Sequence, residues 1–426
     1  MANQPDENKK PEVTKILLEE VFDSPSKKGK KGLGQAVLIP LLAVLSGLIL
    51  GAILIALTTE EVYPAFGRSF FEGLGTAWNA VATSYVALFR GAFGDPARMI
   101  AALQGGEKLE IARAFNPFLE SLVVATPYIF AGLAVAVGFR SGLFNIGAEG
   151  QIFIGAAAAT FVGYSIKGLP PYIHMPLAFL AGAAAGGIWG MIPGWLKAKT
   201  GGSEVINTIM MNWITFRFTE WLLTGPMQRP GSGGVPLSPF IEKSAEIPQL
   251  FDKPIRFHLG FFIALAVAFL VYYFLFKTTW GYNLRTVGAN PNAAKYAGMN
   301  IVKSTVMAMT ISGALAGMAG ANEILAVNRT LALGFSPGFG YDSIALALLG
   351  GSNPLGVVLA SLLFGFLRSG ATKMMLATNI PIDIISILQA FIIIFIAAPA
   401  IIRTIYRLRK PKVDDRVAVT TSWGGK

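Results

Sequence analysis

Long apolar segments, separated by short polar ones, run through most of this chain. Runs of about 20 apolar residues, long enough to cross a bilayer as helices, recur from Ala36 to Ile402. The pattern predicts spans at residues 36–57, 117–139, 172–196, 203–223, 258–276, 304–327 and 381–402. Together with two less regular segments, it indicates an all-α polytopic membrane protein with about 8–10 transmembrane helices.

Two apolar segments depart from this pattern because glycines interrupt them. The first is Ser141–Gly163, and the second is Gly334–Gly351, which continues through Gly356 to Leu367. Irregular backbone at membrane depth is tolerated only where protein or a cavity covers it. The two segments lie at comparable places in the two halves of the chain, an arrangement that points to a transport site at the interface of an internal repeat. We expect Gly-interrupted or re-entrant structure in both.

Polar side chains inside the apolar segments are candidates for a substrate path, because such groups usually face a protein interior or water. The candidates are Asn145, Glu149, Gln151, Asn207, Asn212, Asn322, Glu323 and Asp342. For Asn145, Glu149 and Asp342, a buried structural hydrogen-bond network is an equally good interpretation. Glu149 in particular would serve to cap a half-helix or to bond backbone freed by Gly147 and Gly150.

The distribution of basic residues predicts how the chain is oriented in the membrane. Only 14% of the residues are charged, and the net charge is +11. Basic clusters at Lys27–Lys31, Lys197–Lys199, Lys277–Lys303 and Arg403–Lys412 fall on one side of the predicted topology, so the positive-inside rule places both termini in the cytoplasm. The absence of an aromatic-basic face argues against nucleic acid as a partner.

The same topology divides the chain into five parts. They are a cytoplasmic tail (1–35), a first anchor (36–57), an external or interfacial region (58–117), a membrane-embedded core (118–403) and a basic cytoplasmic tail (404–426).

Several catalytic and metal-binding motifs are absent from the sequence. There is no Cys, no G-x-x-x-x-G-K-[ST] phosphate loop and no H-E-x-x-H, and His174 and His258 stand alone. We therefore predict no catalytic residue, no metal site and no cofactor held by this chain.

A short capped helix is predicted in the polar connector Trp280–Ile301. Asn290 is a good N-cap, Pro291 suits the first helical position, and Gly298 suits the left-handed C-terminal cap. The length and polarity of the connector favour a docking element, although an ordinary capped connector has the same caps.

Three stretches resemble the permease subunits of bacterial ABC importers for branched-chain amino acids, simple sugars and nucleosides. They read GLFNIGAEGQIFIGA, GGSEVINTIMMNWI and LRTVGANPNAAKYAGMNI. The form N-I-G-A-E-G-Q and the long N-terminal region are most similar to nucleoside permeases, which work with a lipoprotein of the basic-membrane-protein type. The resemblance covers roughly Phe118–Arg403.

This resemblance implies a multi-pass subunit in the bacterial plasma membrane. Its partners would be an ATPase that binds ATP and Mg²⁺, a second permease subunit that is a related but different chain, and an external substrate-binding lipoprotein. It also implies a coupling helix that meets the ATPase, with candidate residues Arg285, Gly288, Ala289, Asn290, Pro291, Ala293, Ala294 and Gly298.

The substrate expected from the resemblance is a nucleoside. Simple sugars or branched-chain amino acids are the alternative within the same group. Two further alternatives are a secondary transporter with Glu149 or Glu323 as proton carrier and a non-transport membrane scaffold or enzyme.

Overall fold

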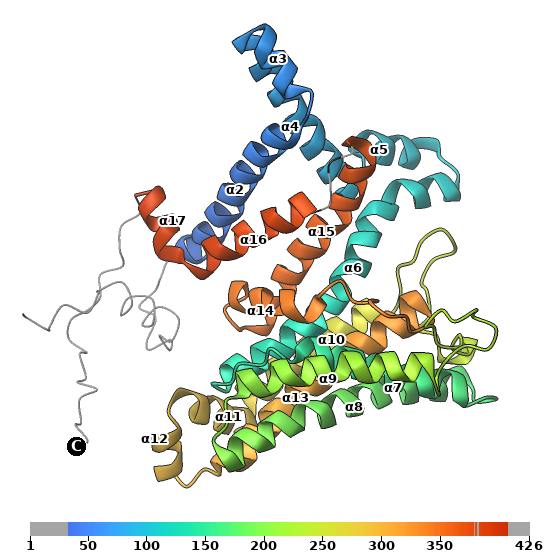
Figure 1. Ribbon diagram of the computed structural model, residues 1–426, viewed down its shortest axis with the longest axis vertical. Helices are drawn as coiled ribbons and strands as arrows, with labels where there is room; N and C mark the ends of the chain where they lie inside the picture. The colour runs from blue at the N-terminus through green and yellow to red at the C-terminus, as the bar shows by residue number, and fades with distance from the viewer. Residues whose placement is uncertain (1–32, 379, 381–382, 408–426) are drawn as a thin grey trace, which may run out of the picture.

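The computed structural model describes residues 33–378, 380 and 383–407, and this part is built from helices (Figure 1). Two isolated bridges, Leu237 with Ala332 and Gln249 with His258, are its only strand-like pairings. Six of the described helices are long and apolar enough to cross a membrane. They are α2 (Leu33–Thr58), α6 (Lys108–Arg140), α8 (Pro171–Thr200), α10 (Gly260–Lys277), α13 (Ile301–Asn322) with its extension η2 (Glu323–Asn328), and α15 (Pro354–Thr378). The prediction of an all-α polytopic membrane protein is confirmed.

Other predicted spans form helices that are shorter or more polar than these six. They are α7 (Ala148–Ser165), α9 (Glu204–Thr224), α14 (Phe339–Leu349) and α16 (Asp383–Ala397). The Lys27–Lys31 cluster and most of the basic tail lie outside the described residues.

The first and last helices form one part of the molecule, shown in the upper half of Figure 1. It contains α2, α3 (Val62–Arg68), α4 (Phe70–Phe93), α5 (Pro96–Gly105), α15, α16 and α17 (Pro399–Ile405). There α4 packs against α15, and α2 packs against α16. The predicted boundary at 117–118 falls inside α6, which begins at Lys108 and keeps Pro117 within the helix.

The central bundle is organised around α13, which packs against α8, α7 and α6. Glycines allow α8 and α13 to approach each other closely. A Cβ on Gly186 would lie 2.4 Å from the Gly313 carbonyl oxygen, and a Cβ on Gly317 would lie 2.3 Å from that of Gly182. Such close packing of small residues is typical of membrane helices.

A folded loop, residues 225–259 with the short helix η1 (Lys243–Ala245), covers one end of this bundle, here called the loop end. The amide of Glu242 donates to Gly163 O at 2.8 Å, and the amide of Ile247 donates to Leu325 O at 2.9 Å. Because η2 is a π-helix, its backbone departs from regular α pairing. These two bonds tie the loop to both α7 and η2.

Candidate functional site

The chain leaves helical geometry between α6 and α7, at residues 141–147, here called the first break. Asn145 is fully buried there. Its Oδ1 accepts from the Gly147 amide at 2.9 Å, and its Nδ2 donates at 2.8 Å to both Gln151 Oε1 and Ser312 Oγ. Ser312 belongs to α13 and donates in turn to Ala134 O at 2.6 Å. The first break is therefore fastened to two neighbouring helices.

Asn212 of α9 binds two further backbone groups of the first break and the start of α7. Its Oδ1 accepts from the Gly150 amide at 2.9 Å, and its Nδ2 donates to Ile146 O at 3.0 Å. The first amides of a helix have no partner within the helix. Asn212 therefore acts as an N-cap for α7 from another helix.

The second broken segment, residues 334–353 around α14, meets the first at Glu149. One carboxylate oxygen of Glu149 accepts from the Gly340 amide in the first turn of α14 at 2.6 Å. A Cβ on Gly340 would lie only 2.2 Å from the Glu149 amide nitrogen. Glu149 is 2% exposed. The interpretation of Glu149 as the cap of a half-helix is confirmed.

Residues of α6 hold α14 at both ends. Arg140, the last residue of α6, donates from Nε to Ser352 O at 2.9 Å and from Nη2 to Gly351 O at 3.0 Å. At the other end of α14, the hydroxyl of Tyr128 donates to Asp342 at 2.9 Å. Tyr128 is a buried residue of α6. Sequence reasoning missed Tyr128 and Ser312, because a lone hydroxyl on an apolar helix gives no distinctive pattern.

The structure divides the predicted path residues into groups. Asn145, Glu149, Gln151 and Asn212 gather at the first break and are almost completely buried even in the isolated chain. They cannot touch a substrate in this conformation. Asp342 and Asn207 are half-buried, and Tyr341 beside Asp342 is 45% exposed.

The remaining two, Asn322 and Glu323, lie apart at the loop end. Asn322 is fully buried beside His258, and neither its amide atoms nor the His258 ring nitrogens have a hydrogen-bond partner in the described residues. Burial, together with Arg256, lowers the pKa of His258 to about 4, which keeps the ring neutral. Glu323 accepts from Asn328 at 3.4 Å.

The predicted capped helix is present as α12 (Pro291–Tyr296). Asn290 Oδ1 accepts from the Ala293 amide at 3.0 Å, and Gly298 adopts a φ of 77°. A second helix, α11 (Thr279–Ala289), precedes it where the sequence predicted only a polar connector. It begins at Thr278, whose hydroxyl accepts from the Gly281 amide at 3.1 Å. We call this end of the bundle the α12 end.

Three of the predicted coupling residues face inward. Ala294 is fully buried, and Arg285 donates to Leu275 O at 2.9 Å. A Cβ on Gly288 would lie 2.4 Å from the Ser141 carbonyl carbon, so α11 rests directly on the first break. The exposed coupling candidates are Ala289, Asn290, Pro291, Ala293 and Gly298.

Sequence reasoning missed Tyr296 of α12, whose side chain is 98% exposed. An aromatic residue in a polar connector was the available signal. Among the described residues no group of His, Cys, Asp or Glu is arranged to hold a metal.

A family model described as "Branched-chain amino acid transport system / permease component" matches residues 118–397. The chain belongs to this permease family. The match begins close to the start of the predicted core and includes both broken segments, α11 and α12. Membership confirms the resemblance, and with the six apolar helices it makes the chain a multi-pass membrane transport subunit.

Several permeases are similar along much of the chain. The guanosine ABC transporter permease protein NupP of Bacillus subtilis is 39% identical over 379 residues, 88% of this chain and 97% of that protein. The nucleoside ABC transporter permease protein NupB of Lactococcus lactis is 31% identical over 92% of this chain and 98% of that protein. The glucose ABC transporter permease protein TsgB13 of Haloferax volcanii is 36% identical over 65% of this chain and 75% of that protein. No solved structure matches the chain.

Proposed function

We propose that this permease subunit imports nucleosides, powered by a separate ATPase that binds ATP and Mg²⁺. The observation that carries the substrate class is the similarity to the guanosine permease NupP over 97% of that protein's length. The proposal includes a second, related permease chain, an external binding lipoprotein at the loop end, and a cytoplasmic α12 end with both termini on that side.

The mechanism that we propose begins at α12. Its exposed face, centred on Tyr296, receives the ATPase. Closure of the ATPase displaces α12 and α11, and the tight contact of Gly288 with Ser141 and Gly142 passes the movement to the first break. From there the bonds of Glu149 to Gly340 and of Arg140 to Ser352 carry α14 along.

In this mechanism the buried polar residues of the first break form a frame, and the substrate meets other groups. The partly exposed Asn207, Tyr341 and Asp342 are the proposed polar groups of the path wall. A neutral substrate does not require the charge of Glu149. The proposed role of this carboxylate is instead to cap the N-terminus of α14.

The substrate class is tested by uptake in a strain from which the gene for this chain has been deleted and then restored. We expect labelled guanosine or another nucleoside to accumulate, and glucose and leucine to remain outside. Glucose uptake would instead favour the sugar alternative suggested by TsgB13. Uptake that persists after the proton gradient is collapsed, with ATP maintained, excludes proton coupling through Glu149 or Glu323.

Substitution of Tyr296 tests the docking face. Tyr296→Ala removes an exposed ring that makes no core contact, so we expect unchanged thermal stability but a loss of uptake of tenfold or more, on the order expected for an interface anchor. Tyr282→Ala on α11 is the matched control, since Tyr282 is also exposed. Equal uptake in the two variants would contradict the docking role.

A further inference from the structure

A groove of about 610 Å³ opens at the α12 end, between the end of α8 and the starts of α11 and α13. Its polar lining includes Lys199, Trp280 and Lys303, and its apolar lining includes Val306 and Met307. Both lysines are exposed, and Lys303 Nζ lies 5.3 Å from the centre of the Trp280 ring. Nothing in the proposed transport mechanism uses this groove.

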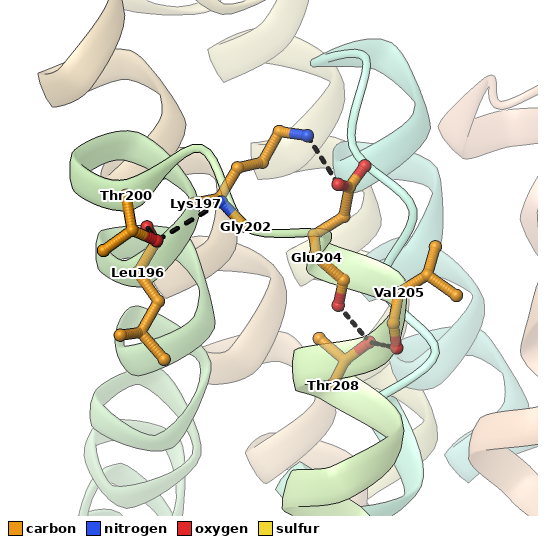
Figure 2. A network of polar contacts seen from close by, with 7 residues as sticks. All are labelled: Leu196, Lys197, Thr200, Gly202, Glu204, Val205 and Thr208. Atoms are coloured by element: carbon orange, nitrogen blue, oxygen red, sulfur yellow. Dashed lines mark hydrogen bonds and ion pairs between the residues drawn. The ribbon is translucent and has the colours of Figure 1, made fainter.

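The charge of the groove is not balanced by a carboxylate. Figure 2 shows that Lys197, two residues before Lys199, pairs with Glu204 at the start of α9. Neither Lys199 nor Lys303 has an ion pair among the described residues. The sequence contains no Asp or Glu from His258 to Asn322. Two cations therefore converge on one groove without a carboxylate partner.

An exposed apolar stripe on α8 leads along the helix to Lys199. Its members, Ile188, Ile192 and Trp195, precede Lys199 at helical spacing and are 59%, 37% and 51% exposed. On a membrane helix such a stripe contacts lipid chains, and tryptophan and lysine at its end mark the headgroup level. The stripe thus extends from the depth of the lipid acyl chains to the groove.

We propose that this groove binds the anionic headgroup of a membrane phospholipid, with its phosphate between Lys199 and Lys303. Its acyl chains lie along the Ile188–Trp195 stripe. A basic pocket between helices at the membrane surface is typical of anionic lipid sites. The apolar stripe favours a lipid over a soluble anion, because a soluble anion has no acyl chain to lie along it. It also favours a lipid over an acidic protein segment, because such a segment would approach the groove from water.

Native mass spectrometry of the purified full chain tests the site, with phosphatidylglycerol and phosphatidylcholine of identical acyl chains as probes. We expect selective retention of phosphatidylglycerol. The double variant Lys199→Gln/Lys303→Gln should weaken it by about fivefold for each lysine. The matched control Lys277→Gln/Lys295→Gln removes two exposed charges at the same end outside the groove, and it should retain the lipid. All four lysines are exposed, so each variant should fold, and circular dichroism verifies this.

Four results would overturn the proposal. Phosphatidylcholine could bind as well as phosphatidylglycerol, or both double variants could lose the lipid equally. Displacement of the lipid by millimolar inorganic phosphate would instead show a soluble-anion site. Displacement by the purified ATPase subunit would show that the groove receives protein.

Discussion

The two broken segments differ in how their freed backbone groups find partners. The first break is closed by Asn145 within it and by Asn212 and Ser312 from α9 and α13. The second has its own Ser336, whose hydroxyl accepts from the Phe339 amide at 3.2 Å, and it is also held by Glu149 of the first segment and by Tyr128 and Arg140 of α6. The first break is therefore a frame held from several sides, and α14 is an element attached to that frame at its two ends.

Gly340→Leu should have the largest effect on this arrangement, because the new side chain would meet the backbone of Glu149, which cannot move aside cheaply. We expect uptake to be lost and stability to fall by about 3 kcal/mol or more. Thermal unfolding in detergent and uptake measure the two effects. Gly75→Leu, on α4 with open space around it, is the control. Normal stability of Gly340→Leu would refute the close contact between the segments.

Replacement of Glu149 separates its charge from its hydrogen bond. Glu149→Leu leaves the buried Gly340 amide without an acceptor, and we expect a loss of about 2–3 kcal/mol in stability and of most uptake. Glu149→Gln keeps an acceptor oxygen and should retain uptake of a neutral nucleoside. If the Gln variant were as damaged as the Leu variant, the carboxylate charge would have a role beyond capping.

Asn212→Ala weakens the frame itself. The Gly150 amide and the Ile146 carbonyl lose their partners, so we expect a loss of about 2 kcal/mol in thermal unfolding experiments. Asn207→Ala, on the same helix but half-buried, should have little effect on stability. Equal losses in the two variants would mean that α9 does not hold the first break.

Arg140→Gln should have the smallest effect, because its bonds to Gly351 and Ser352 are partly exposed. We expect faster amide hydrogen exchange at residues 350–353, with about 1 kcal/mol lost locally. Arg285→Gln is the matched control. Both arginines lie over the Phe276 ring, Arg140 at 5.7 Å and Arg285 at 5.0 Å from its centre, but Arg285 donates to Leu275 and not to α14. Unchanged exchange in Arg140→Gln would show that α14 is held without Arg140.

Features that depend on neighbouring residues in the chain could be predicted from the sequence. The cap at Asn290, the left-handed Gly298, the interruptions by glycine and the small-residue packing of α8 all follow local rules. The predicted span 117–139 lies within α6, but hydropathy did not show that the helix begins at Lys108 and keeps Pro117 inside it.

The sequence alone determined that this is an all-helical membrane protein with two interrupted segments and a capped connector, because length, hydropathy and caps are properties of short stretches. The permease family followed from the resemblance to known permeases and not from these patterns. The tertiary structure decided what the polar residues do. Glu149 and Gly340 are 191 positions apart, and no periodicity relates them. Only packing could show that Glu149 caps α14, that Ala294 faces inward and that Tyr296 does not. The reason is that burial and hydrogen-bond partners depend on which helices come together.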